Sequence, residues 1–337
     1  MPYALIVNDT STTLHYGCNA VMTTLVEGLG TRNILPSWMW PVGVDWRDHR
    51  AFLLSRQADV VVVNGEGTIH HSADRERARS LCRIPELARA KGVPAILVNA
   101  SIEALQPDCL DALRLYDAVF VREARSRRYL ASHGIDAAVT PDLSLGVPSG
   151  ASSERRNVLV TDSVVREATT ALRDFANSIE GSSASMRLRP TRWQRRLSRA
   201  ATVLGHRKPG RARYVPTRDP GEFIARLRRS RAVVAGRFHA VTLCLHTDTP
   251  FLAIRSNTSK IEATLEDALG DTTRLVDIDS LRGDEARTRL TTGIGFSKGE
   301  LEALVAYRAR AARDREHMFD AIAGLAAGNR NRMEQQA

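Results

Sequence analysis

A carboxylate between two glycines, followed by two adjacent histidines, is the first group of residues in this chain that could do chemistry. Four consecutive valines lead into the run Asn64-Gly65-Glu66-Gly67-Thr68, and His70 and His71 follow shortly after. The valines predict a buried strand, and glycine lets the backbone turn tightly and approach a ligand closely. We expect Glu66 to point into open space, where its carboxylate could act as a general base. The alternative is an ordinary turn with both histidines in solvent.

Polar side chains also follow three other apolar runs. They are Asn8, Asp9, His15 and Asn19 after the first run, Ser101 after another and Arg122 after a third. Because the carboxyl ends of parallel strands meet at one edge of a sheet, we expect these side chains to line a common rim. A single arginine in such a place is most often an ion-pair partner, but four polar strand ends together predict a binding site.

Cationic side chains open two successive helices in the second half of the chain. Arg237 and His239 follow the apolar run 232–236, and Lys260 starts a helix after the run 250–254. Helix N-termini bind anions through free N–H groups and the macrodipole, and cationic side chains add charge-assisted hydrogen bonds there. This arrangement predicts a site for a phosphate, a carboxylate or both. In the alternative, Arg237 pairs with a carboxylate and Lys260 is solvated.

Apolar runs typical of strands alternate with stretches typical of helices along the whole chain. The runs are continuously apolar, as expected for parallel strands that are covered on both faces. They predict strands at 3–8, 59–64, 94–99, 117–121, 157–163, 232–236, 250–254 and 274–278, and helices at 19–29, 74–90, 108–115, 123–132, 220–229, 238–246, 259–269 and 298–326. We therefore expect an α/β protein with two Rossmann-like, doubly wound domains that face a cleft.

The expected boundary between the domains is the segment 141–156, which is rich in Pro, Gly and Ser and therefore typical of a linker. Residues 1–150 would form the first domain and 151–337 the second, and we find no internal repeat. No apolar run is long enough to span a membrane, and the N-terminus does not have the pattern of a signal peptide. The four cysteines are far apart, which favours free thiols in the cytoplasm over a disulfide framework or a zinc site.

A basic segment in the second domain carries the charge imbalance of the chain. Residues 186–213 contain ten basic and no acidic residues, and the net charge of the whole chain is +10. Helical spacing would place Trp193 and Leu197 on one face with arginines around the rest, which is typical of helices that lie on anionic membranes. The residues expected to contact the membrane are Arg192, Trp193, Arg195, Arg196, Leu197 and Arg199. A solvated insertion is the alternative, and we expect no nucleic-acid binding because the segment has one aromatic residue and no recognised module.

The chain resembles the polysaccharide pyruvyl transferases over roughly residues 5–270. The resemblance rests on the triplet Arg237-Phe238-His239 and the residues that follow it, on Val121-Arg122-Glu123 and on Asp142-Leu143-Ser144-Leu145. It implies two Rossmann-like domains arranged as in the GT-B glycosyltransferases. It also implies that the triplet and Arg122 bind phosphoenolpyruvate. After its third strand the family has a glycine-rich turn followed by a small residue, where this chain has Asn64-Gly65-Glu66-Gly67-Thr68.

This resemblance implies transfer of a pyruvyl group from phosphoenolpyruvate to a sugar of a bacterial surface polysaccharide, with formation of a pyruvate ketal. The expected catalytic residues are Glu66 as the base, Asp9 as the second choice for the base, and His239 as the acid or as a partner of the phosphate. The expected donor-binding residues are Arg122, Arg237, Phe238, Asn257, Ser259 and Lys260. The expected acceptor-binding residues are Asn64, Gly65, Gly67, Thr68, His70, His71, His15 and Asn19. Phosphoenolpyruvate is a substrate, and we expect no cofactor and no metal.

Two other functions stay open at this point. One is a GT-B glycosyltransferase for surface glycans that uses a nucleotide-activated sugar, such as a CMP-linked acidic sugar. The other is a non-catalytic binding protein whose basic segment contacts a membrane or a nucleic acid. For the transferase, we expect a lipid-linked saccharide acceptor and a peripheral position at the inner face of the cytoplasmic membrane.

Overall fold

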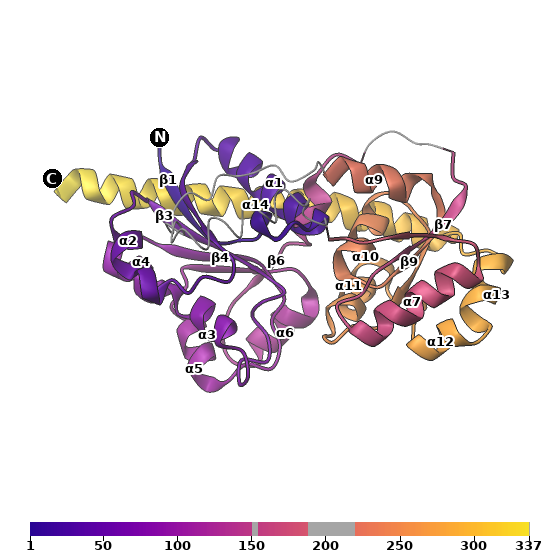
Figure 1. The fold of residues 1–337 in the computed structure, drawn as a ribbon. Coiled ribbons are helices and arrows are strands. Elements are labelled where there is room, and N and C mark those ends of the chain that lie inside the picture. The colour runs from indigo at the N-terminus through magenta and orange to yellow at the C-terminus, as the bar shows by residue number, and fades with distance from the viewer. Residues whose placement is uncertain (150–153, 188–219, 337) are drawn as a thin grey trace, which may run out of the picture.

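Two parallel sheets with helices packed around them make up the protein (Figure 1). The computed structural model describes residues 1–149, 154–187 and 220–336. The segment expected to contact a membrane, Arg192 to Arg199, lies outside the described residues. Among the described residues, no helix combines the length and the apolarity that a membrane crossing requires.

The first sheet has six strands in the order β2-β1-β3-β4-β5-β6, and every neighbouring pair is parallel. The strands are β1 (Tyr3–Asp9), β2 (Leu35–Pro41), β3 (Val60–Glu66), β4 (Ala95–Ala100), β5 (Ala118–Val121) and β6 (Ala138–Val139). The helices are α1 (Tyr16–Gly30), α2 (Arg50–Leu54), α3 (Glu76–Cys82), α4 (Ile84–Lys91), α5 (Pro107–Leu113) and α6 (Ala124–Ala131). We did not predict β2 from the sequence; it contains two prolines, which are unfavourable inside a sheet. Strand β2 lies at the edge of the sheet, where prolines are tolerated.

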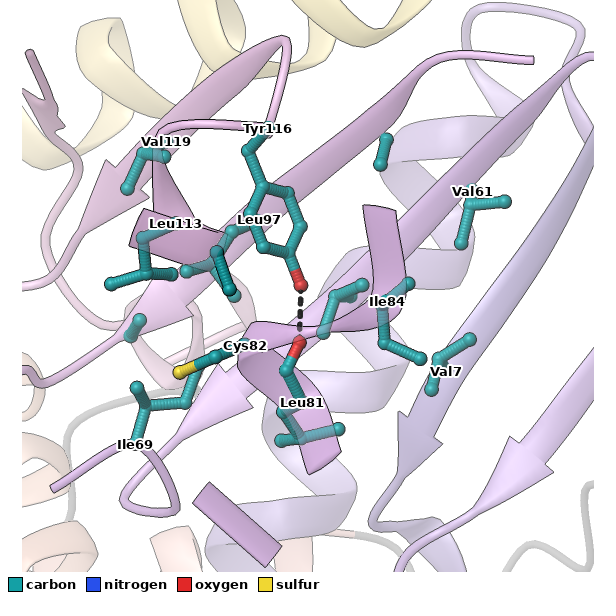
Figure 2. Close-up of a cluster of buried hydrophobic side chains, with 14 of the residues drawn as sticks. Val7, Val61, Ile69, Leu81, Cys82, Ile84, Leu97, Leu113, Tyr116 and Val119 are labelled. Carbon is teal, nitrogen blue, oxygen red and sulfur yellow. Dashed lines mark hydrogen bonds between the residues drawn. The ribbon is translucent and has the colours of Figure 1, made fainter. Parts of the chain in front are cut away.

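The two faces of this sheet are buried in separate hydrophobic cores, because successive side chains of a strand point to opposite faces. Leu5, Val61 and Val63 lie in one core, and Ile6 and Val62 lie in the other. Figure 2 shows the first of these cores, where the Tyr116 hydroxyl donates a 2.7 Å hydrogen bond to the carbonyl of Leu81. Burial on both faces explains why the strand sequences are continuously apolar.

The second sheet has five strands in the order β11-β10-β9-β7-β8, again all parallel. Its strands are β7 (Asn157–Thr161), β8 (Ser182–Ala184), β9 (Ser230–Ala235), β10 (Phe251–Ile254) and β11 (Leu275–Val276). Its helices are α7 (Arg166–Ser178), α9 (Pro220–Arg229), α10 (Phe238–His246), α11 (Lys260–Leu269), α12 (Ile278–Arg282) and α13 (Glu285–Thr292). Read from β8, this order repeats that of the first sheet, so each sheet has a switch point beside its first strand, where ligands bind in doubly wound folds.

A single long helix, α14 (Lys298–Gln336), runs along both halves (Figure 1). Leu304 and Tyr307 on this helix pack in a core of the second sheet, whereas Met318 and Phe319 pack in a core of the first sheet. Gly28 of α1 makes the second contact possible, because a Cβ atom there would overlap the ring of Phe319. This packing differs from the expectation that all residues after 150 belong to the second domain.

The segment expected to be a linker begins inside the protein core. Asp142 is buried, and the short 3-10 helix η3 (Leu143–Gly146) that follows packs against α1 and α10. Leu145 and Val147 lie in a core of the second sheet. The linker prediction is therefore wrong for residues 142–147, because a segment with buried apolar side chains and a buried carboxylate is held in place by packing and ion pairing.

Candidate active site between the two sheets

Arg122 directly follows β5 and is held in a fixed orientation by two partners from its own half. Its Nη1 donates to Asp142 Oδ2 at 2.8 Å, and its Nε and Nη2 donate to Ser101 Oγ at 3.0 and 2.5 Å. Both members of the ion pair are buried, with side chains 1% and 2% exposed. Burial alone would raise the pKa of Asp142, but the charges of Arg122 and His239 lower it below its ordinary value. The guanidinium is therefore pre-positioned at the end of the sheet.

Phe238 and Lys260 approach Arg122 from the second half. They are the first residues of α10 and α11, so the N-termini of both helices lie here. The Phe238 ring centre is 4.3 Å from Arg122 Cζ and 5.7 Å from Lys260 Nζ. Within the described residues the Lys260 ammonium donates no hydrogen bond. Burial, followed by the charge of Arg122, lowers the pKa of Lys260 to about 8, although the carboxylates of Glu123 and Glu66 act in the opposite direction. Neither carboxylate is within ion-pair distance of the ammonium in the part of the chain that the structure describes.

His239 and His15 face each other across the two halves, with their ring centres 5.4 Å apart. His15 precedes α1, and its Nδ1 accepts a hydrogen bond from Gly17 N. A Cβ atom at Gly17 would overlap the ring of His239, so glycine is needed for this close approach. His239 Nε2 is buried without a hydrogen-bond partner and lies 3.9 Å from Asp142 Oδ1.

Burial lowers the pKa of both histidines. For His15 the pKa falls well below its ordinary value, because the neighbouring His239 and Arg237 add to the effect of burial. For His239 the effect of burial is opposed by the carboxylates of Asp142 and Glu66, although the pKa is still lowered. His239 therefore holds a proton more readily than His15 does.

Glu66 ends β3 and is buried, so the expectation that it points into open space is wrong. Its Oε1 accepts hydrogen bonds from Thr10 Oγ1 at 2.5 Å and Asn64 Nδ2 at 3.3 Å, and its Oε2 accepts one from Cys18 Sγ at 3.5 Å. The reason is topological: β1 and β3 are neighbours at the switch point, which brings Thr10 beside Glu66. Burial raises the pKa of the Cys18 thiol well above its ordinary value, so this thiol remains a donor.

The two glycines that flank Glu66 have different roles. A Cβ atom at Gly65 would lie 2.5 Å from Ala100 Cβ, so the packing of β3 against β4 requires glycine there. A Cβ atom at Gly67 would lie 3.2 Å from Lys260 Nζ, so this glycine leaves space beside the ammonium. Gly67 is thus the glycine that lies at the site.

Arg237 forms an ion pair with a carboxylate, which is the first part of the alternative to an anion site given in the sequence analysis. Its Nε and Nη2 donate to the two carboxylate oxygens of Asp162 at 2.8 and 2.7 Å. Asp162 follows β7 and Arg237 follows β9, so this pair lies at the switch point of the second sheet. The same alternative placed Lys260 in solvent, and this part is wrong, because Lys260 is partly buried.

Several other residues that were expected at the site are buried or form hydrogen bonds within the protein. Asp9 is fully buried, accepts a hydrogen bond from Ser11 N, and has a pKa raised by burial. Ser259 Oγ donates to Glu103 Oε2 at 2.5 Å, which joins the two halves. The remaining residues are Asn64 and Asn19, both buried, Thr68, which is partly exposed after β3, and Asn257, which is exposed and accepts a hydrogen bond from Ser256.

His70 and His71 form a separate pair beside the cluster. Their Nδ1 atoms are 2.9 Å apart, and Arg75 Nη1 lies 2.5 Å from His70 Nε2. Burial, followed by the charge of Arg75, lowers the pKa of His70 to about 3, so His70 is neutral and accepts from the guanidinium. His71 is half exposed and lies 3.8 Å from Glu103 Oε1.

Two groups of described residues could offer ligand atoms to a metal ion. They are His15, Cys18 and His239, and His70, His71 and Glu103, with all ligand atoms of a group within 4.8 Å of one another. In the first group the raised pKa of Cys18 opposes binding, because a thiol must lose its proton to coordinate a metal. The expectation that the reaction needs no metal stays a prediction.

Four residues of this region were not predicted from the sequence. They are Cys18, Glu103, Asp142 and Asp162. Asp162 could have been found by the rule applied to the first half, because it is a polar residue that directly follows a strand. Asp142 lies in the Asp-Leu-Ser-Leu run that carries part of the family resemblance, but the run was assigned to a linker.

Two doubly wound sheets, with the ends of the first sheet facing the helix starts of the second, define a GT-B-like fold. Solved structures of similar fold include a putative UDP-N-acetylglucosamine 2-epimerase from Listeria monocytogenes (14% identity, TM-score 0.55, 95% of each chain covered). Another is UDP-GlcNAc 2-epimerase from Neisseria meningitidis bound to UDP-GlcNAc (12% identity, TM-score 0.52, 95% of this chain and 99% of that chain covered). At these identities the similarity shows the fold alone.

The sequence itself is more specific. The model of the polysaccharide pyruvyl transferase family matches residues 6–258, and the chain belongs to this family. No curated protein sequence matches the chain. Membership implies that the protein is a transferase.

Proposed function

We propose that this protein transfers the pyruvyl group of phosphoenolpyruvate to two hydroxyls of a saccharide and forms a pyruvate ketal. The observation that supports this most is the Lys260 ammonium, which is partly buried beside the fixed guanidinium of Arg122 and forms no hydrogen bond or ion pair with the described residues. A cation in such a place favours an anionic ligand, and the N-termini of α10 and α11 add partial positive charge. Phosphoenolpyruvate has both a phosphate and a carboxylate for these groups to bind.

The chemistry requires one proton at carbon and two bonds to oxygen. A proton added to C3 of phosphoenolpyruvate forms the methyl group and leaves C2 electron-poor. One sugar hydroxyl then bonds to C2, the bond between C2 and the phosphate oxygen breaks, and the second hydroxyl bonds to C2. Of the two protons that the hydroxyls lose, one replaces the proton given to C3 and the other leaves with the phosphate.

The residues of the cluster can be given roles in this reaction. Arg122 and Lys260 bind the anionic groups of the donor, and Arg237 supports them from its pair with Asp162. His239 delivers the proton to C3. Burial lowers the pKa of His239, and the carboxylate of Asp142, 3.9 Å away, opposes this effect and favours the protonated form. Glu66 accepts a proton from a sugar hydroxyl, and it is preferred over Asp9 because Glu66 keeps 7% of its surface exposed whereas Asp9 is fully buried.

We further propose that the acceptor is a lipid-linked precursor of a surface polysaccharide, handled at the inner face of the cytoplasmic membrane. A nucleotide-sugar glycosyltransferase is the second candidate, because one fold relative is described as bound to UDP-GlcNAc. The donor distinguishes the two proposals, since only the first reaction releases phosphate from phosphoenolpyruvate.

A donor scan tests this function. The protein is incubated with glycan precursors and either phosphoenolpyruvate or a panel of nucleotide sugars, and phosphate release and the product mass and NMR spectrum are measured. We expect phosphate release and a ketal only with phosphoenolpyruvate, and loss of both in His239→Asn and Lys260→Met. The matched controls His317→Asn and Lys298→Met change exposed residues of α14 and should keep full activity. Transfer from a nucleotide sugar, without phosphate release from phosphoenolpyruvate, would contradict the proposal.

A further inference from the structure

A cavity of about 450 Å³ lies beside the candidate active site, in the second half of the protein. Its walls are the ends of β7 and β8, one side of α7, Arg226 of α9, and Tyr16 of α1. Cavities that bind small molecules have volumes of roughly 300–1,000 Å³. This cavity therefore has room for a sugar with attached phosphates.

Three of the residues that line the cavity are arginines whose charge is available to a ligand. Arg173, Arg187 and Arg226 are exposed, and within the described residues their guanidinium groups form no hydrogen bond or ion pair. The carboxylate in the cavity wall, Asp162, is already paired with both Nε and Nη2 of Arg237. The charge presented to a ligand is therefore positive.

The wall of the cavity adjoins the candidate active site. Tyr16 lines the cavity and directly follows His15, whose ring centre is 5.4 Å from that of His239. Arg187 forms a backbone bridge with His15, and its charge contributes to the lowered pKa of this histidine. Asp162 holds Arg237 on one side and lines the cavity on the other. A ligand anchored by the arginines therefore lies next to the residues that surround His239.

We propose that this cavity binds the diphosphate of a saccharyl diphosphate acceptor, and that the arginines hold the diphosphate while the saccharide extends toward the donor site. Guanidinium groups suit this ligand, because they bind phosphate oxygens through paired hydrogen bonds. The proposal rests on the proposed function, since it names the class of the second substrate. Nucleoside diphosphates share the diphosphate group, and the test below separates the two sources.

The test measures binding and needs neither phosphoenolpyruvate nor turnover. The probes are N-acetylglucosaminyl diphosphate esterified to an undecyl chain and, separately, uridine 5′-diphosphate. Titration calorimetry at physiological salt compares wild type with the double variant Arg173→Gln/Arg226→Gln. The matched control is Arg166→Gln/Arg229→Gln, which removes the same charge from exposed positions of the same two helices outside the cavity wall.

We expect the saccharyl diphosphate to bind at least roughly tenfold more weakly to the cavity variant, because each lost hydrogen bond to a charged group weakens binding by about that factor. The control should bind as wild type does, and saturating phosphoenolpyruvate should not displace the probe. Equal affinities in all three proteins would overturn the proposal. Arginine-dependent binding of uridine 5′-diphosphate alone would overturn the assignment to an acceptor. If the cavity variant loses binding but no ketal ever forms, the proposed function fails and the cavity assignment stands.

Discussion

The guanidinium of Arg122 lies over the ring of Phe238, with 4.3 Å between Cζ and the ring centre. Arg122 comes from the end of the first sheet and Phe238 from the start of a helix in the second half. The same ring lies 5.7 Å from Lys260 Nζ. Phe238 is therefore within cation–π distance of both cations, which lie close enough together for the charge of Arg122 to lower the pKa of Lys260.

Replacing Phe238 tests whether this stacking positions the donor site. Phe238→Leu preserves apolar bulk but removes the aromatic ring, and a cation–π contact of this kind contributes about 0.5–2 kcal/mol. We expect the KM for phosphoenolpyruvate to rise roughly tenfold while kcat changes little. Steady-state kinetics with a thermal melt give both values. An unchanged KM in a folded Phe238→Leu protein would show that the ring has only a packing role.

Lys260 predicts a pH dependence of donor binding. Its pKa is lowered to about 8, so the ammonium loses its proton as the pH rises through this value and an anion is held less well. We expect the Kd for phosphoenolpyruvate to increase above about pH 8 and this increase to disappear in Lys260→Arg, because arginine remains charged. Calorimetric titrations between pH 7 and pH 10 measure the effect.

The same shift predicts the opposite effect on stability. Between about pH 8 and the ordinary lysine pKa of 10.5, the unfolded chain holds a proton that the folded protein has released. The contribution of Lys260 to the free energy of unfolding therefore rises with pH over this range. Lys260→Met should remove this dependence, as followed by denaturant unfolding at several pH values. A wild-type contribution that falls over the range would contradict the assignment.

Glu66→Gln separates a catalytic from a structural role for this carboxylate. Glutamine keeps the shape of the side chain and one oxygen that can accept from Thr10 or Cys18. If Glu66 is the acceptor base, turnover should fall by roughly a hundred- to ten-thousandfold, while donor affinity is retained. If it only joins β1 to β3, the melting temperature should fall and saturated turnover should stay near the wild-type rate.

The basic segment predicts binding to anionic membranes. Replacing Arg192, Arg195, Arg196 and Arg199 with glutamine should weaken co-sedimentation with vesicles that contain anionic lipid, because each basic residue near such a surface contributes about 1 kcal/mol. Activity on a soluble acceptor should remain mostly intact. Unchanged co-sedimentation at low salt would rule out this role for the segment.

The architecture followed from local sequence patterns. Continuously apolar runs such as Val60 to Val63 are typical of strands that are covered on both faces, and alternate valines of this run lie in the two cores. The periodic stretches between these runs form helices. The Arg237-Phe238-His239 triplet was likewise correctly placed at the start of a helix, because a strand and a helix meet there in the chain. These features depend on neighbouring residues, which the sequence shows directly.

Which charges remain available to a ligand was decided only by the tertiary structure. Arg237 and Asp162 are 75 positions apart in the chain and Arg122 and Asp142 are 20 apart, yet both pairs form hydrogen bonds. Glu66 is buried because Thr10 of a neighbouring strand end reaches it. Lys260 lies beside a second cation because the helix that it begins faces Arg122 and Gly67. The energy of a charge depends on its partners and its burial, and both arise from contacts between segments that are distant in the sequence.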